Sequence, residues 1–146
     1  MYTLDTPQKN EYFNLLEVWE SSVKATHHFL RPGDIEVFKT IIKEEEVFGH
    51  VNLICARDSN KTILGFLGTS DNSIEMLFIS ANSIGQGIGK LLLRHAIDHL
   101  KITKVDVNEQ NHQALKFYEH FGFKTIARSE IDGTGKPYPI LHMQLL

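Results

Sequence analysis

The chain has 146 residues, of which 42% are hydrophobic and 23% are charged, a balance that excludes disordered and fibrous proteins. Its net charge of −3 and the lack of a Lys or Arg stripe argue against nucleic acid as a partner. No apolar run approaches the roughly 18 residues of a membrane span, and the first residues carry no leader pattern. We therefore expect no membrane partner and a cytoplasmic location.

Length and cysteine content narrow the class further. The length is close to the commonest size of single domains, so one domain over residues 1–146 is expected. Cys55 is the only cysteine, which excludes an internal disulfide. Because it lies in an apolar stretch, we predict a buried, unreactive thiol.

Two helices are expected in the first third of the chain. Thr6 and Pro7 predict an N-cap and a first helical position, and apolar residues recur near helical spacing from Phe13 to Val23. Asp34 is expected to cap a second helix, which would end at Gly49.

The periodicity then changes to that of strands. Apolar and β-branched residues predict strands at residues 51–56, 62–69 and 74–79, with polar turns between them. Three consecutive strands with short connections favour an antiparallel meander.

The second half of the chain begins with a strand, a glycine loop and a helix. The loop is Gly85-Gln86-Gly87-Ile88-Gly89, and the helix carries its apolar residues between Leu91 and Leu100. The remaining expected elements are a strand at 105–107 with Asp106 near its end, a helix stopped by Gly122, and strands at 123–131 and 140–146. With a short strand near residues 2–4, this order predicts an α/β sandwich around a mixed sheet.

The glycine loop is the strongest candidate for a binding site. Glycines without Cβ atoms let the backbone approach a ligand, and amides at a helix N-terminus favour an anion such as a pyrophosphate. A plain tight turn is the alternative. A P-loop is excluded because Ile84 and Leu91 occupy required positions, and Lys90 stands where a dinucleotide fingerprint needs its third glycine.

The stretch from Leu77 to Leu92 resembles motif A of the GNAT acetyltransferase superfamily. A second segment, with Asn111, Ala114, Tyr118 and Phe121-Gly122-Phe123, is similar to the family pattern N-x-x-A-x-x-x-Y-x-x-x-G-F. Segments at 22–30, 108–111 and 135–139 resemble the bacterial YjaB-type branch of the superfamily, which is described as acetylating protein lysines. The resemblance covers nearly the whole chain.

This resemblance implies the GNAT fold, a mostly antiparallel sheet of six to seven strands splayed in the middle, with about four helices on its faces. It implies acetyl-CoA as co-substrate, without a metal, and an amine acceptor. The implied cofactor-binding residues are Leu77, Phe78, Ile79, Gly85, Gln86, Gly87, Ile88, Gly89, Lys90 and Asn111. Asn111 is also a good N-cap. Ile84 replaces the family's Arg or Gln, so weaker cofactor binding is expected.

Catalytic groups follow from the needs of acetyl transfer. By the resemblance, Tyr118 would stabilise the departing CoA thiolate, while Asp106, Glu75 or an ordered water would take the proton of the amine. His27 would line the acceptor pocket. The pair His95 and His99 lacks the Glu of a zinc hydrolase helix, so no metal is expected.

Several points stay open at this level. The acceptor is a protein lysine or a small-molecule amine, and the chain is a monomer or a homodimer. A non-catalytic acyl-CoA-binding module is the main alternative function, and a dinucleotide enzyme is a weaker one.

Overall fold

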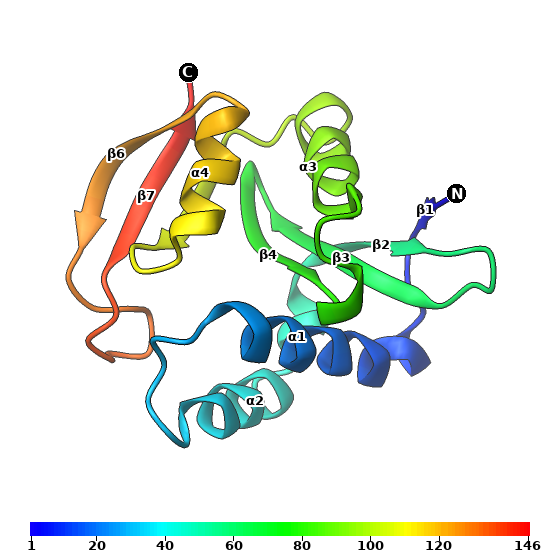
Figure 1. Cartoon of the computed structure of the whole chain (residues 1–146), viewed down its shortest axis with the longest axis horizontal. Helices are drawn as coiled ribbons and strands as arrows, with labels where there is room; N and C mark the ends of the chain where they lie inside the picture. Colours follow the sequence, from blue (N-terminus) through cyan, green and yellow to red (C-terminus); the bar gives the residue numbers. More distant parts are fainter.

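A single seven-stranded sheet forms the centre of the computed structural model, which describes all 146 residues (Figure 1). The strands stand in the order β1-β2-β3-β4-β5-β7-β6. Their bounds are β1 (Thr3–Asp5), β2 (Asn52–Arg57), β3 (Ile63–Ser70), β4 (Ser73–Ile79), β5 (Lys104–Asn108), β6 (Phe123–Ser129) and β7 (Ile140–Leu145). Only β4 and β5 pair in parallel, so the predicted mixed, mostly antiparallel sheet is confirmed.

Four α-helices cover the sheet, as predicted. They are α1 (Tyr12–Thr26), α2 (Asp34–Glu44), α3 (Ile88–Asp98) and α4 (His112–His120). Short 3-10 turns occupy Lys9–Glu11, Val47–His50 and Ala81–Ser83. Figure 1 shows α1 and α2 on one side of the sheet and α3 and α4 on the other. None of the four has the length and apolar character that crossing a membrane requires.

The first helix starts later than the sequence pattern predicts. Pro7 is buried outside the helix, and the chain first makes the 3-10 turn in which the Gln8 amide donates to Glu11 Oε1 at 2.9 Å. Regular α-helix begins only at Tyr12. Phe13, expected on the apolar face, is 68% exposed.

The bounds of the second helix also differ from the prediction. Gly33, in the left-handed region at φ 87°, is the N-cap, and Asp34 is the first helical residue. The helix ends at Glu44 rather than at Gly49, because Glu46 turns left-handed at φ 50° and starts a 3-10 turn.

Two apolar clusters lie on opposite faces of the sheet. One packs α3 and α4 against the strands around Leu92, Leu93 and Phe123, and the other packs α1 around Leu15 and Phe66. Cys55 is fully buried in the second cluster, where burial raises the pKa of its thiol to about 12. The cysteine is therefore unreactive at neutral pH, as predicted.

A β-bulge in β4 separates the two halves of the sheet. Thr69 pairs with Ile74 and Gly68 with Met76, so Glu75 is the extra residue that has no partner on β3. Beyond this point β4 leaves β5, and these two strands pair with each other only at Ser73–Lys104 and Ile74–Val105. The predicted splay in the middle of the sheet is thus present, and the bulge is its local cause.

Candidate active site

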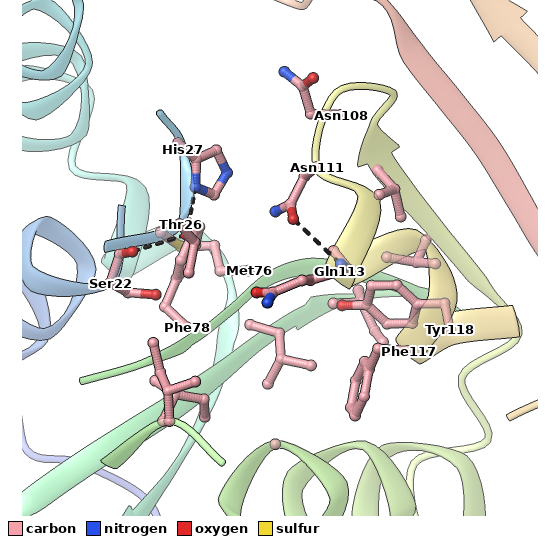
Figure 2. Close-up of a pocket in the computed structure, with 18 of the residues that line it drawn as sticks. Ser22, Thr26, His27, Met76, Phe78, Asn108, Asn111, Gln113, Phe117 and Tyr118 are labelled. Carbon is pink, nitrogen blue, oxygen red and sulfur yellow. Dashed lines mark hydrogen bonds between the residues drawn. The ribbon is translucent and has the colours of Figure 1, made fainter. Parts of the chain in front are cut away.

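A cavity of about 570 Å³ fills the space between the diverging strands β4 and β5 (Figure 2). Its walls come from the end of α1, β4 from Ile74 onward, the glycine loop, β5 and one face of α4. Every residue that the sequence assigned to the site except Gln86 and Ile88 lines this cavity. The structure therefore brings together positions that lie up to 91 residues apart, from His27 to Tyr118.

The edge of β4 offers unpaired backbone groups to the cavity. The Ser80 amide donates across to Leu64 O of the neighbouring chain segment at 2.8 Å. Amides alternate in direction along an antiparallel strand. Those of Leu77 and Ile79 therefore point away from β3, toward the gap that opens where β5 diverges from β4. The Phe78 side chain instead packs against Phe66, with ring centroids 5.9 Å apart.

The glycine loop carries a run of free amides. Gly85 and Gly87 have φ values of 86° and 87°, which side chains with a Cβ rarely adopt, and Gly87 is the N-cap of α3. None of the amides of residues 85–90 donates to a protein acceptor; the first helical bond runs from Leu91 N to Gly87 O at 3.0 Å. Gly85, Gly87, Gly89 and Lys90 line the cavity, so free amides and the positive end of the α3 dipole lie at this end of it.

Hydrogen bonds of the Gln86 side chain hold the glycine loop in place. Tyr2 Oη donates to Gln86 Oε1 at 2.9 Å, and Gln86 Nε2 donates to Asn82 O at 3.4 Å. Ile84 is 43% exposed at the cavity rim. Gln86 thus links the loop to Tyr2, the residue before β1, through a contact over 84 residues that sequence reasoning missed.

Residues of α4 close the opposite wall. Asn111 is the N-cap of α4, since its Oδ1 accepts from Ala114 N at 3.2 Å, and it also lines the cavity. Tyr118 is 6% exposed and makes no hydrogen bond inside the protein. Its hydroxyl oxygen is nevertheless not a buried atom without a partner. Its hydroxyl points into the cavity in Figure 2, and burial raises the pKa of this phenol.

The two candidate carboxylates stand in different surroundings. Asp106 lies in the middle of β5, not at a strand end, and its Oδ1 is 2.7 Å from His142 Nδ1 of β7. His142 Nε2 in turn lies 2.7 Å from Ser129 Oγ on β6. Glu75, the bulge residue, is exposed at the cavity and has no hydrogen-bond or ion-pair partner.

His27 ends α1 on the far side of the cavity. It is half-buried, and Thr26 Oγ1 lies 2.7 Å from its Nδ1. Burial, followed by the charge of neighbouring His28, lowers the pKa of His27 to about 4. The imidazole is therefore neutral at physiological pH.

A second cavity, of about 310 Å³, adjoins the first on the α1 and α2 side of the sheet and is mainly apolar. The two cavities share His27, Glu75, Met76, Phe78 and Asn108.

The wall of this second cavity includes Tyr138, which is 4% exposed. Its hydroxyl donates to Asp34 Oδ2 and accepts from the Arg31 amide at 3.0 Å, while Lys136 lies 3.2 Å from Asp34. This hydrogen bond holds the pKa of Asp34 below its usual range. Sequence reasoning missed these contacts because their members lie more than 100 residues apart.

The splayed sheet, the free loop amides and the cavity together form a site with room for an extended ligand that carries an anionic group. Residues 20–145 match the family model described as "Acetyltransferase (GNAT) domain". The chain therefore belongs to the GNAT family and is an N-acetyltransferase, as its motifs indicated.

Curated relatives place the chain within the family. It is 35% identical to peptidyl-lysine N-acetyltransferase YjaB of Salmonella typhimurium over 98% of this chain and 97% of the relative. It is 37% identical to the Escherichia coli YjaB over 88% and 86% of the two chains. The resemblance to the YjaB-type branch is thereby confirmed.

Solved structures agree with this placement. The solution structure of apo YjaB from Escherichia coli matches with a TM-score of 0.89 at 32% identity, covering 100% of this chain and 98% of that one. The PaiA N-acetyltransferase of Thermoplasma acidophilum, in complex with coenzyme A, shares the fold with a TM-score of 0.76 at 20% identity, covering 97% and 98%.

A metal centre has no ligand set in this structure. No group of three or more His, Cys, Asp or Glu side chains is placed to hold an ion. His95 and His99, the pair noted in the sequence, lie with their ring centroids 5.1 Å apart and have no third partner.

Proposed function

We propose that this protein transfers the acetyl group of acetyl-CoA to lysine side chains of proteins, by direct attack of the amine in a ternary complex. The observation that carries this proposal is the cavity between β4 and β5, which the glycine loop with its free amides lines at one end and which adjoins an apolar cavity at the other. An aliphatic stem ending in an amine suits the second cavity. The names of both YjaB relatives support a lysine acceptor; a small-molecule amine is the alternative.

Backbone groups would hold the cofactor. The amides of residues 85–90 would bind the pyrophosphate, and those of Leu77 and Ile79 would bind the pantetheine arm as a substitute strand in the gap beside β4. Phe78 would contribute through the cavity wall and Asn111 through its position at the far end of the arm. Gln86 would order the loop by its bond to Tyr2.

The chemical step needs a neutral amine and a stabilised thiolate. A lysine with pKa near 10.4 becomes neutral at pH 7 at a cost of about 4.6 kcal/mol, which desolvation in the apolar cavity would reduce. Tyr118 would donate a hydrogen bond to the sulfur, since its raised pKa keeps the phenol protonated. Glu75, Asp106 or water would receive the proton that leaves the ammonium, and His27 would line the acceptor side.

The whole chain of 146 residues would act as one acetyltransferase domain, because all seven strands belong to one sheet. A cytoplasmic location is in keeping with the free, buried Cys55 and the lack of any disulfide. The assembly would be a monomer or a homodimer.

Turnover of a lysine peptide tests this function. Purified protein should bind acetyl-CoA in a one-to-one complex and release CoA thiol only when the peptide is present. Tyr118→Phe should reduce kcat roughly 10- to 100-fold with unchanged acetyl-CoA affinity, because only the group facing the sulfur is removed. Tyr12→Phe, whose ring packs on Phe48 away from the cavity, is the matched control. Equal kcat values for both variants would refute the role of Tyr118.

A further inference from the structure

His27 stands where three cavities meet. It lines the cofactor cavity, the apolar cavity of about 310 Å³ and a third cavity, also about 310 Å³, beside the loop between α1 and α2. Its amide donates to Val23 O at 2.8 Å as the C-cap of α1, and its ring contacts Phe29 at a centroid distance of 5.4 Å. The ring is therefore held at the junction of the donor and acceptor sides.

The hydrogen-bond chain behind His27 fixes its tautomer. Thr26 Oγ1 lies 2.8 Å from Ser22 O, and a carbonyl can only accept, so the single hydroxyl hydrogen points to Ser22. The 2.7 Å contact between Thr26 Oγ1 and His27 Nδ1 then requires Nδ1 to carry the hydrogen. Nε2 is left with a free lone pair.

That lone pair is available to a ligand. His27 Nε2 has no hydrogen-bond partner in the protein and is not a buried atom, and the residue lines the cavity. In Figure 2 the second nitrogen of the ring points away from Thr26 toward the open space between α1 and α4. The side chain is neutral at physiological pH because burial lowers its pKa to about 4.

We propose that His27 is a catalytic residue of the acetyl transfer, accepting through Nε2 a proton from the attacking nitrogen, and that Thr26 is the positioning residue that frees this atom. The proposal rests on the proposed transferase function of the same cavity. Glu75 would attract the ammonium form of the acceptor by charge, whereas a neutral imidazole in an apolar wall does not favour that form.

The reaction balances with this assignment. The ammonium loses its first proton to solvent on entering the apolar cavity. The neutral nitrogen then attacks the thioester carbon, and as the C–N bond forms this nitrogen becomes much more acidic, within reach of a weakly basic imidazole. His27 Nε2 takes that second proton and passes it to water in the open cavity. The C–S bond breaks, and the CoA thiolate takes one proton from solvent.

The tautomer can be tested without any substrate. Long-range ¹⁵N–¹H correlation spectra of the wild-type protein at pH 7 should show His27 with a hydrogen on Nδ1 and none on Nε2. Thr26→Val should shift the ring toward the Nε2–H form, while Thr26→Ser, which keeps the hydroxyl, should retain the wild-type pattern. An Nε2–H or doubly protonated ring in the wild type would overturn the proposal.

Kinetics tests the catalytic role with the same variants. On a lysine peptide, His27→Ala should lower kcat roughly 100-fold, Thr26→Val roughly 10-fold, and Thr26→Ser less than about twofold. Acetyl-CoA affinity, measured by calorimetry, should stay within about twofold throughout, which also shows that each variant is folded. Imidazole in the buffer should restore part of the activity of His27→Ala.

The outcomes separate the two proposals. Wild-type turnover with unchanged kcat in His27→Ala would overturn the role of His27 and leave the transferase function intact. A raised KM with unchanged kcat would reduce His27 to a binding residue and would also overturn the role. A wild-type protein that turns over no amine would refute the transferase proposal itself, while the spectra would still decide the tautomer.

Discussion

The two ends of the active-site cavity are built in opposite ways. The end proposed to bind the cofactor offers backbone amides from one stretch of chain, residues 77–90, whereas the end proposed to bind the acceptor is lined by side chains from α1, β4 and the loop between β6 and β7. Contacts at the acceptor end join Arg31 to Tyr138, 107 residues apart. The cofactor end should therefore tolerate side-chain changes but not backbone changes, and the acceptor end should show the reverse.

The largest effect is expected from a backbone change in the glycine loop. Gly87→Val puts a β-branched residue at φ 87°, which costs about 2 kcal/mol and turns the amides of the loop away from the ligand. Acetyl-CoA affinity should fall roughly 30-fold or more by calorimetry. Gly135→Val is the matched control, because Gly135 also has a positive φ, 82°, with open space around it, but lies outside the cavity.

This pair of variants shows whether the loop amides or general backbone strain cause the loss of acetyl-CoA affinity. If Gly135→Val weakened acetyl-CoA binding as much as Gly87→Val, the loss would come from general strain and not from the amide cradle.

At the acceptor end we expect a smaller effect, which changes the KM for the acceptor and not the affinity for acetyl-CoA. Tyr138→Phe removes the hydroxyl that donates to Asp34 and accepts from the Arg31 amide, so the two loops lose their tie. The KM for a lysine peptide should rise roughly 3- to 10-fold, in line with the loss of a hydrogen bond to a charged group, while acetyl-CoA affinity stays unchanged. A change confined to acetyl-CoA affinity would contradict the division into two ends.

Stability at acid pH should depend on Glu11, which lines neither cavity. Glu11 accepts hydrogen bonds from Arg57 at 2.7 and 2.8 Å, and these bonds, with that from Gln8, lower its pKa to about 2. Because the folded pKa lies below the unfolded value of 4.5, the stabilisation is fully present above pH 4.5 and is lost as the pH falls toward 2.

Thermal melts at several pH values check this linkage. Glu11→Gln should lower Tm by a few degrees at pH 7, and its difference from the wild type should shrink between pH 4.5 and pH 2. Glu17→Gln, at an exposed site on α1 without an ion pair, is the control and should track the wild type. A constant difference at all pH values would show that the ion pair with Arg57 is not the source of the stabilisation.

The smallest effect is expected at Ile84, the departure from the family motif. Restoring the motif residue with Ile84→Gln should improve acetyl-CoA affinity less than about threefold, because the amides of residues 85–90 are already free of protein acceptors and Gln86 already holds the loop. Ile131→Gln, at another exposed isoleucine, is the control. A gain above tenfold would mean that the side chain, and not the backbone, dominates binding at this end.

The same contrast explains how much the sequence could predict. The order of elements follows from local periodicity and the glycine loop, so the sheet and the four helices are predicted correctly. The start of α1 is not, because the Gln8–Glu11 contact favours a 3-10 turn over the signal of Thr6 and Pro7. Helix ends depend on such local competition, which periodicity does not record.

The site also has a part that the sequence predicts and a part that it does not. The glycine loop and Tyr118 belong to short motifs, and the structure places them in one cavity. The partners of Asp106 and Asp34, which are His142 and Tyr138, come from the C-terminal part of the chain, and no local pattern links them. Such contacts exist only once the sheet order has brought β7 beside β5.

The most direct test of the account is an amide chemical-shift titration of the protein with acetyl-CoA. Because we propose that backbone amides bind the cofactor, the signals of residues 85–90, Leu77 and Ile79 should move most and should saturate at one equivalent. The Phe78 amide, which faces β3, should move less. Saturable binding whose largest shifts lie elsewhere, with the loop amides unmoved, would contradict the claim that the backbone of this cavity is the cofactor site.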